Sequence, residues 1–599
     1  MKMRRLPMTR SSLRRCALIL ILALPLSSLA AERSIDEFFD RFTADWVRGN
    51  PDLATSLRYF SGEEQDRLER QLTPLTRAYQ EERTRLARRG LEELRKFDRT
   101  KLDDTRRLSA ELMDWLLEAV VRAEPYRDFH FPLQQFSGAN VDLIETFTLR
   151  HPLVTPKDAD NFVARLALMD DRMNEAVAEA KRLADRNLLP PKFIVQATLA
   201  SMHTFADAPV QNNPLVTVFA QKTASIEGLP ADKRAALQQR VGELVQKEIY
   251  PAWQKAIALL DAIGPRTTDD AGLWRFKGGD AAYANSLLRF TTTDLTPGEI
   301  HEIGLKQVAT IEARMDEILK SLGRTQGAVR ERMAKLEDDL RYPDPTSDAA
   351  RTQIMSDIDG YMKDAIARSI PMFERTPKTP VIAQPFPRFR EASAAANYNR
   401  APLDGSRPAI FQMPLRVQRM TRLGLRTLVY HETVPGHHFQ IALEQENPDL
   451  PRFRQARALG GISAMSEGWA LYAEKLAAES GWYEGDPEGL LGQLSAELFR
   501  ARRLVVDTGL HSKKWTRQQA IDFGIEGSEV DRYVVYPGQA CSYMIGQLRI
   551  LEMRDRARAE LGDRFSLRGF HSAVLNTGTM PLGALEREVE RYVDVVKGK

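Results

Sequence analysis

Apolar residues recur every three or four positions along most of this chain, and this spacing predicts a mostly α-helical protein. In residues 158–187 the recurring residues are Phe162, Leu166, Met169, Met173, Val177 and Ala180. At that spacing they would share one face of a helix. Thr155, Thr296 and Thr516 each precede such a run, where a threonine side chain can satisfy the first free amides of a helix. We therefore expect a large helical fold.

Few segments favour strands. Residues 408–415, Pro-Ala-Ile-Phe-Gln-Met-Pro-Leu, form a β-type run bracketed by prolines. Proline is tolerated at strand ends and edges, so this run predicts a short edge strand. Residues 375–408 are rich in proline and alanine and predict an ordered loop. No internal repeat interrupts the chain, so we expect residues 31–599 to form one large helical domain.

Residues 1–30 have the pattern of a secretory signal peptide. Six basic residues precede the apolar run ALILILALPL, and Ser28-Leu29-Ala30 offers small residues for cleavage. Cys16 precedes the apolar run, which is a poor position for a lipid anchor. We expect a periplasmic or secreted protein that has no membrane attachment after cleavage.

The charge balance gives no indication of a polyanion-binding protein. The chain has 85 basic and 82 acidic residues, and six of the basic ones lie in residues 1–30. The remainder carries 79 basic against 82 acidic residues, a net charge of −3. Neither nucleic acid nor a membrane surface is therefore expected as a partner. Only Cys541 remains after residue 30, so no internal disulfide is expected.

The stretch YHETVPGHHFQ, residues 430–440, contains His431, His437 and His438 with Glu432 beside the first. Two histidines four apart on a helix can share a metal ion, but residues six apart diverge by about 120° in a regular helix. Pro435 has no amide hydrogen, so the helix should kink or unwind there. His437 and His438 both remain open as the second ligand, and Glu432 has the position of a general base.

A third ligand is expected from GGISAMSEGWALYAEKLAAES, residues 460–480, which predicts a helix that is apolar nearly all round and therefore buried. Glu467 and Glu474 lie together on one side of it. Buried carboxylates are unfavourable unless they are paired or bind a metal. A cation held by two histidines and Glu467 meets this requirement. The alternatives are a polar core network, or pairing of Glu467 with Arg502 or Arg503.

HETVPGHHFQ, SEGWALYAE and YPGQACSYMIGQ together resemble the bacterial DUF885 family. This family is similar to gluzincin zinc peptidases, including helical oligopeptidases and carboxypeptidases. The resemblance implies one zinc ion per chain, a helical fold with a central channel, and catalytic elements within residues 405–550. A Gly-His pair closes the peptidase motif, which favours His437 as a ligand. SEGWA resembles the segment of related aminopeptidases whose glutamate is the third zinc ligand. The resemblance therefore implies this role for Glu467.

Further residues are expected to line the active site. Tyr536 to Gly546 resembles the tyrosine-rich channel walls of these peptidases, and Tyr543 is our choice for an oxyanion donor, with His511 as a second candidate. His438, if not a ligand, would contact substrate. The sequence thus predicts an exported zinc peptidase of short peptides, with Glu432 as general base. The alternatives are a zinc hydrolase of other amides or esters, and an inactive periplasmic binding or scaffold protein.

Overall fold

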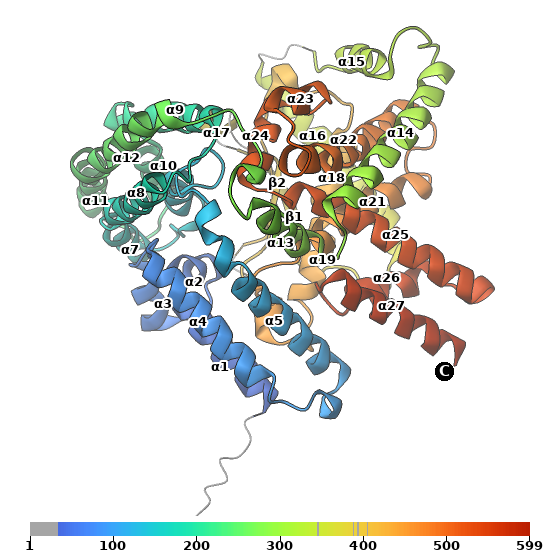
Figure 1. Cartoon of the computed structure of the whole chain (residues 1–599), viewed down its shortest axis with the longest axis horizontal. Coiled ribbons are helices and arrows are strands. Elements are labelled where there is room, and N and C mark those ends of the chain that lie inside the picture. Colours follow the sequence, from blue (N-terminus) through green and yellow to red (C-terminus); the bar gives the residue numbers. More distant parts are fainter. Residues whose placement is uncertain are drawn as a thin grey trace, which may run out of the picture.

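The computed structural model describes residues 34–598, except 344–346, 387, 392–394, 404 and 406. The predicted signal peptide, residues 1–30, lies outside the described residues. The described chain is mostly α-helical, as the sequence predicted, with one small sheet (Figure 1). No helix among the described residues combines the length and the apolar character needed to cross a membrane.

Two groups of helices make up the first half of the chain. The first group is α1 (Ile35–Arg48), α2 (Pro51–Leu57), α3 (Gly62–Glu69), α4 (Arg77–Leu94) and α5 (Asp104–Arg122). The second is α6 (Ala139–Glu145), α7 (Pro156–Leu166), α8 (Met169–Asp185), α9 (Lys192–Ala206), α10 (Pro214–Thr223), α11 (Ala231–Leu244) and α12 (Tyr250–Ile263). Helices α7 to α12 form the lobe on the left of Figure 1 and share their own apolar core.

The second half contains the remaining helices and all three strands. In chain order they are α13 (Gly279–Thr291), α14 (Pro297–Ser321), α15 (Val329–Asp339), α16 (Asp348–Ser369), β1 (Val381–Pro385), α17 (Arg388–Glu391), β2 (Asn397–Asn399), β3 (Ala409–Met413), α18 (Leu425–Glu432), α19 (His437–Gln445), α20 (Arg452–Gln455), α21 (Ser463–Glu479), α22 (Pro487–His511), α23 (Arg517–Asp522), α24 (Gly527–Val535), α25 (Ser542–Leu561), α26 (Leu567–Leu575) and α27 (Leu582–Lys597).

The predicted helix starts are confirmed. Thr155, Thr296 and Thr516 each accept a hydrogen bond from a first-turn amide and form complete capping boxes. One prediction needs correction: residues 158–187 are not one helix but α7 and α8, which are separated at Ala167 and Leu168. The Leu168 amide donates to the Arg165 carbonyl, three residues back, so the chain tightens into a turn there.

The edge-strand prediction for residues 408–415 is wrong. β3 is the middle strand, paired in parallel with β1 and antiparallel with β2. Pro408 and Pro414 lie just outside β3, so neither removes a hydrogen bond from the ladder. The predicted loop 375–408 contains both edge strands. β2, Asn-Tyr-Asn, carries little β-pattern of its own, whereas β1 begins with the β-branched residues Val381 and Ile382.

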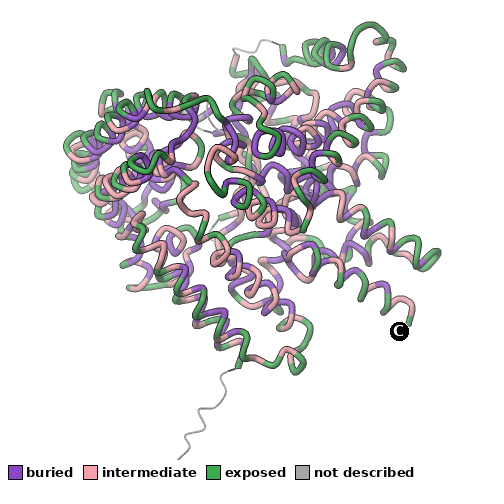
Figure 2. Tube along the Cα trace, viewed as in Figure 1, coloured by how far each residue is buried: buried purple, intermediate pink, exposed green. Residues whose placement is uncertain are grey.

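Helix α21 lies deep in the second half, where it packs against α18, α19 and α25. Figure 2 shows buried residues concentrated where these helices face one another. Gly468 and Gly546 let α21 and α25 touch, because a Cβ atom at Gly468 would lie 2.4 Å from the Gly546 carbonyl carbon. Trp469 and Tyr472 are fully buried on α21. Burial of such side chains contributes about 1.5–3 kcal/mol each, which fixes the helix that carries Glu467 and Glu474.

Candidate metal centre

The helix is interrupted between His431 and His437, as expected from Pro435. Helix α18 ends at Glu432 and α19 begins at His437, with Val434 and Pro435 joined by a cis peptide bond between them. Because the two histidines belong to different helices, their directions are not tied to a common helical period. The six-residue separation therefore does not keep their side chains apart.

The turn between α18 and α19 is held from both sides. The indole Nε1 of Trp469 donates to the Pro435 carbonyl at 2.8 Å, which ties the turn to α21. Gly436 lies against the end of α18, where a Cβ atom would be 2.0 Å from the carbonyl oxygen of His431. Only glycine fits at this position without moving the backbone.

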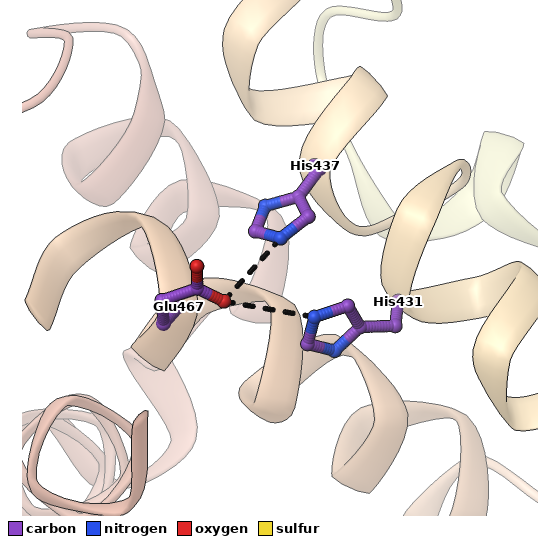
Figure 3. A group of neighbouring side chains, drawn as sticks. All are labelled: His431, His437 and Glu467. Carbon is purple, nitrogen blue, oxygen red and sulfur yellow. Dashed lines mark ion pairs between the residues drawn. The ribbon is translucent and has the colours of Figure 1, made fainter. Parts of the chain in front are cut away.

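The break brings His431, His437 and Glu467 together, as Figure 3 shows. The Oε2 atom of Glu467 lies 3.6 Å from Nε2 of His431 and 3.4 Å from Nε2 of His437. One donor atom from each residue lies within 4.8 Å of the other two.

The ion-pair alternative for Glu467 is not observed. Arg502 pairs with Glu312 and Arg503 with Glu529, so neither arginine neutralises Glu467. The carboxylate of Glu467 instead faces the two imidazoles.

Glu474 is a site residue to which the sequence assigned no role. Its Oε1 lies 2.7 Å from Nδ1 of His431, so Glu474 and Glu467 hold the two ring nitrogens of one imidazole. Its only cationic neighbour besides His431, among the described residues, is Arg500 at 3.8 Å. The seven-residue spacing of Glu467 and Glu474 placed both on one side of α21, but their common partner could be found only in three dimensions.

The electrostatics of this site favour a cation. Burial lowers the pKa of His431, but contacts with Glu467 and Glu474 outweigh burial and raise this pKa to about 10. Burial raises the pKa of Glu467, but His437 and His431 outweigh it and bring the pKa well below its usual range. Both shifts show that positive charge is stabilised between these side chains. A metal ion and a proton on His431 would compete for the same negative field.

The donor set fits zinc. Zinc is commonly bound by imidazole nitrogen and carboxylate oxygen at about 2.0–2.2 Å in a tetrahedron, so its donor atoms lie roughly 3.4 Å apart. The two histidine–glutamate separations, 3.6 and 3.4 Å, agree with that spacing. The contact from Glu474 to His431 is of the kind that orients a zinc-ligating imidazole. The ligand roles themselves stay predictions.

Glu432, the predicted general base, is buried next to the three candidate ligands. Burial raises its pKa, and the nearby His431 and His437 act in the opposite direction. No described residue forms a hydrogen bond with its carboxylate, so packing alone holds the side chain.

His438 points away from the cluster. Its Nδ1 lies 3.3 Å from the hydroxyl of Tyr398 on β2, and burial lowers its pKa to about 4. The structure therefore separates the two rival histidines. His437 lies next to Glu467, and His438 contacts Tyr398 of the sheet.

The prediction for His511 as an oxyanion donor needs correction. Its ring is fully buried, Nδ1 accepts from the Leu273 amide at 3.1 Å, and Nε2 lies 3.0 Å from the Tyr533 carbonyl. Burial lowers its pKa to about 4. Both nitrogens are engaged by backbone, so this imidazole has no N–H left for a substrate. A lone histidine in an apolar helical run is as consistent with a core residue as with a site residue.

Asp507 holds the segment before Tyr543 in place. Its carboxyl group accepts from the Tyr283 hydroxyl at 2.6 Å and from the Gly538 amide at 3.0 Å, and it is fully buried. Gly538 has a φ of 80°, which glycine tolerates best. This contact fixes the turn that follows Tyr536.

Tyr543, the preferred oxyanion donor, is buried beneath Arg503, whose guanidinium lies 4.5 Å from its ring centre. Burial raises the pKa of Tyr536, Arg289 and Arg532 act in the opposite direction, and the charge of Glu467 makes a smaller contribution that raises it. The role of Tyr543 stays a prediction, and Tyr536 is a second tyrosine that the sequence did not select.

The family model described as "Bacterial protein of unknown function (DUF885)" matches residues 51–589. The chain belongs to this family. The match includes every residue of the candidate metal centre. A crystal structure from Colwellia psychrerythraea, described as a candidate lipoprotein, is similar with a TM-score of 0.88 and 31% identity over 94% of this chain and 99% of that chain.

A second solved structure shares the fold at lower identity. It is a candidate lipoprotein of unknown function from Shewanella oneidensis, with a TM-score of 0.68 and 17% identity over 93% of this chain and 99% of that chain. Comparison with curated proteins found no match. These comparisons show the family and the fold. A function can be argued only from the residues of the site.

Proposed function

We propose that this DUF885 protein is an exported zinc-dependent peptidase that hydrolyses short peptides. The observation that carries the proposal is the convergence of His431, His437 and Glu467 at zinc-like spacing, with Glu432 beside them. The resemblance of HETVPGHH and SEGWA to gluzincin motifs supports the same reading.

The chemistry divides between the metal and Glu432. Zinc in a two-histidine, one-carboxylate donor set polarises a carbonyl and lowers the pKa of water. Glu432 accepts a proton from the attacking water and passes it to the leaving amine. Burial of Glu432 raises its pKa, which brings a carboxylate closer to the working pH of a base that must later act as an acid.

The sheet offers a surface for an extended peptide. The middle strand β3 has both edges paired, so strand addition is left to the outer edges of β1 and β2. β2 lies nearer the site, because its Tyr398 contacts His438 on α19. A cavity of about 410 Å³ lies between these elements, and its lining includes Tyr398, Ile441 and Gly461. We assign this cavity to substrate.

Export is proposed from the signal-like pattern of residues 1–30. The two similar structures are described as candidate lipoproteins, and lipoproteins are exported. The cysteines of this chain are Cys16, which precedes the apolar run, and Cys541, which is buried. Neither is placed for a lipid anchor after that run, so we propose a periplasmic or secreted protein.

Metal analysis and peptide digestion test the proposal together. Purified mature protein should contain about one zinc per chain and cleave members of a short-peptide library read by mass spectrometry. Glu432→Gln should keep zinc and lose at least roughly 10²-fold in turnover, because general-base catalysis contributes about 10²–10⁴-fold. Glu484→Gln, at an exposed position, is the matched control.

Each alternative predicts a different result. Stoichiometric zinc with cleavage of amides or esters but of no peptide would identify another hydrolase. Absence of zinc and of turnover would favour a binding or scaffold protein. Peptide cleavage that Glu432→Gln leaves within a few-fold of the parent would refute the base assignment.

A further inference from the structure

A second, larger cavity adjoins the proposed substrate cavity. Its volume is about 910 Å³, and residues of α4, α5, α6 and α13 contribute to its wall. Ser56 borders both cavities, so they are neighbours, with β2 and α19 beside the first and α13 beside the second. A peptide bound along β2 would have room to extend into it.

The charges on this wall are unequal. Each acidic residue in the lining is paired with an arginine: Asp52 with Arg165, Glu124 with Arg88, Asp142 with Arg150, and Glu179 with Arg182. Three lining arginines, Arg83, Arg127 and Arg289, form no ion pair with any described carboxylate. The cavity therefore has an excess of positive charge in a protein whose arginines are mostly paired.

Two of these three arginines are held by the protein. Arg83 donates to the Trp46 carbonyl at 2.7 Å and lies 3.6 Å from the centre of its ring. Arg127 donates to the Thr84 hydroxyl at 2.8 Å. These contacts satisfy part of each guanidinium.

Arg289 differs, because no described residue accepts a hydrogen bond from it. Its guanidinium lies 5.3 Å from the Trp115 ring and 6.0 Å from the Phe290 ring. Arg122, which also has no carboxylate partner among the described residues, lies 6.0 Å from the same Trp115 ring. Its positive charge repels that of Arg289. Two like charges beside one aromatic ring, in a partly buried place, are unfavourable unless an anion joins them.

Arg289 lies close to the segment that leads into α21, the helix that carries Glu467. A Cβ atom at Gly460 would lie 3.8 Å from Nη2 of Arg289, and Gly460 is three residues before the start of α21. From Ser463 to Glu467 this helix rises only about 6 Å. Tyr536 is influenced by the charges of both Arg289 and Glu467. A short extended peptide can therefore reach from the metal centre to Arg289.

We propose that Arg289 binds a carboxylate of the substrate peptide in the larger cavity. A planar guanidinium with free donors suits bidentate binding of a carboxylate. The carboxylate is either the C-terminal group or an acidic side chain near it. This inference rests on the proposed peptidase function for its substrate, but the anion site itself is tested by binding.

Calorimetric titration of zinc-loaded mature protein tests the assignment, with Glu432→Gln present throughout so that no probe is consumed. The probes are trialanine, trialanine amide, and alanyl-glutamyl-alanine amide. The comparison is between this background alone, Arg289→Gln, and Arg85→Gln, a control at an exposed arginine of α4. Circular dichroism establishes that each variant is folded.

Trialanine should bind about 10- to 100-fold more tightly than its amide in the background and in Arg85→Gln, and Arg289→Gln should abolish the difference. The same Arg289-dependent gain for the glutamyl peptide alone would place the carboxylate on a side chain. Equal binding of all three probes, or a preference unchanged by Arg289→Gln, would overturn the proposal.

Arg289→Lys covers the case in which Arg289→Gln does not fold. It keeps the charge but not the bidentate donors, so the preference should fall several-fold, and an undiminished preference would again overturn the assignment. An Arg289-dependent preference in a protein that cleaves no peptide would leave the anion site standing and remove only the proposed function.

Discussion

Nδ1 of His431 lies 2.7 Å from Oε1 of Glu474, while Nε2 of the same ring faces Glu467. The imidazole is therefore oriented by one carboxylate toward another. Glu474 is almost fully buried, and its second oxygen, Oε2, has no hydrogen-bond partner among the described residues. A carboxylate in this position costs stability unless its charge serves the imidazole beside it.

Glu474→Gln should weaken zinc binding about 10- to 100-fold, because the amide removes the charge that orients His431 and makes it a stronger ligand. Chelator competition measures the dissociation constant. Glu479→Gln, on the same helix but paired with Arg554, is the control. Equal zinc affinity in both variants would mean that Glu474 serves packing alone.

The helical pattern predicted most of this fold, because apolar spacing and capping residues act locally. The break at Pro435 was equally local, since a proline in the interior of a helix removes a backbone hydrogen bond and clashes with the preceding turn. The pairing of β3 on both sides was not predictable in this way. β2, Asn-Tyr-Asn, is short and polar, and β1, Val-Ile-Ala-Gln-Pro, is apolar at its start but contains nothing that specifies β3 as its neighbour.

The candidate site, too, could be predicted from the sequence only in part. His431, Glu432 and Glu467 could be selected from residue type and expected burial. The link from Glu474 to His431 and the backbone partners of His511 join segments that are 43 and at least 22 residues apart. Such contacts depend on how helices pack, and periodicity does not specify that.

His437 and His438 should respond differently to substitution. His437→Ala should strip zinc, because it removes one of three protein ligands. His438→Ala should retain zinc and reduce turnover at most, because its ring contacts Tyr398 and not Glu467. His203→Ala, at an exposed histidine of α9, is the control for histidine loss. Elemental analysis that finds zinc in His437→Ala but not in His438→Ala would reverse the assignment.

Gly436→Ala should prevent the turn between α18 and α19 from closing. The added methyl group would lie 2.0 Å from the His431 carbonyl oxygen and 2.4 Å from that of Tyr430, and neither backbone atom can move without displacing a helix end. We expect loss of zinc and a lower melting temperature.

Gly360→Ala is the control for this glycine. It lies within α16 with nothing within 4 Å of the added atom, so the substitution should be neutral or stabilise the helix by about 0.5–1 kcal/mol. A Gly436→Ala protein with normal zinc content and melting temperature would show that the turn has room the structure does not indicate.

Asp507 should make the protein less stable as pH rises. Burial raises its pKa from 3.8 to about 7, against the hydrogen bonds from Tyr283 and Gly538. Between about pH 4 and pH 7 the folded protein therefore binds more protons at this position than the unfolded chain does. The free energy of unfolding then falls as pH rises through this window, by up to about 1.4 kcal/mol per pH unit from this group.

Asp507→Asn removes the titration while keeping an oxygen that can accept from Tyr283 and Gly538. Urea unfolding at several values between pH 4 and pH 8 measures the difference in free energy from the parent. That difference should shift in favour of the variant as pH rises, and level off above about pH 7. Asp522→Asn, at an exposed position on α23, is the matched control. A difference between Asp507→Asn and the parent that stays constant across this range would mean that Asp507 is ionised throughout, stabilised despite its burial by the hydrogen bonds that it accepts from Tyr283 and Gly538.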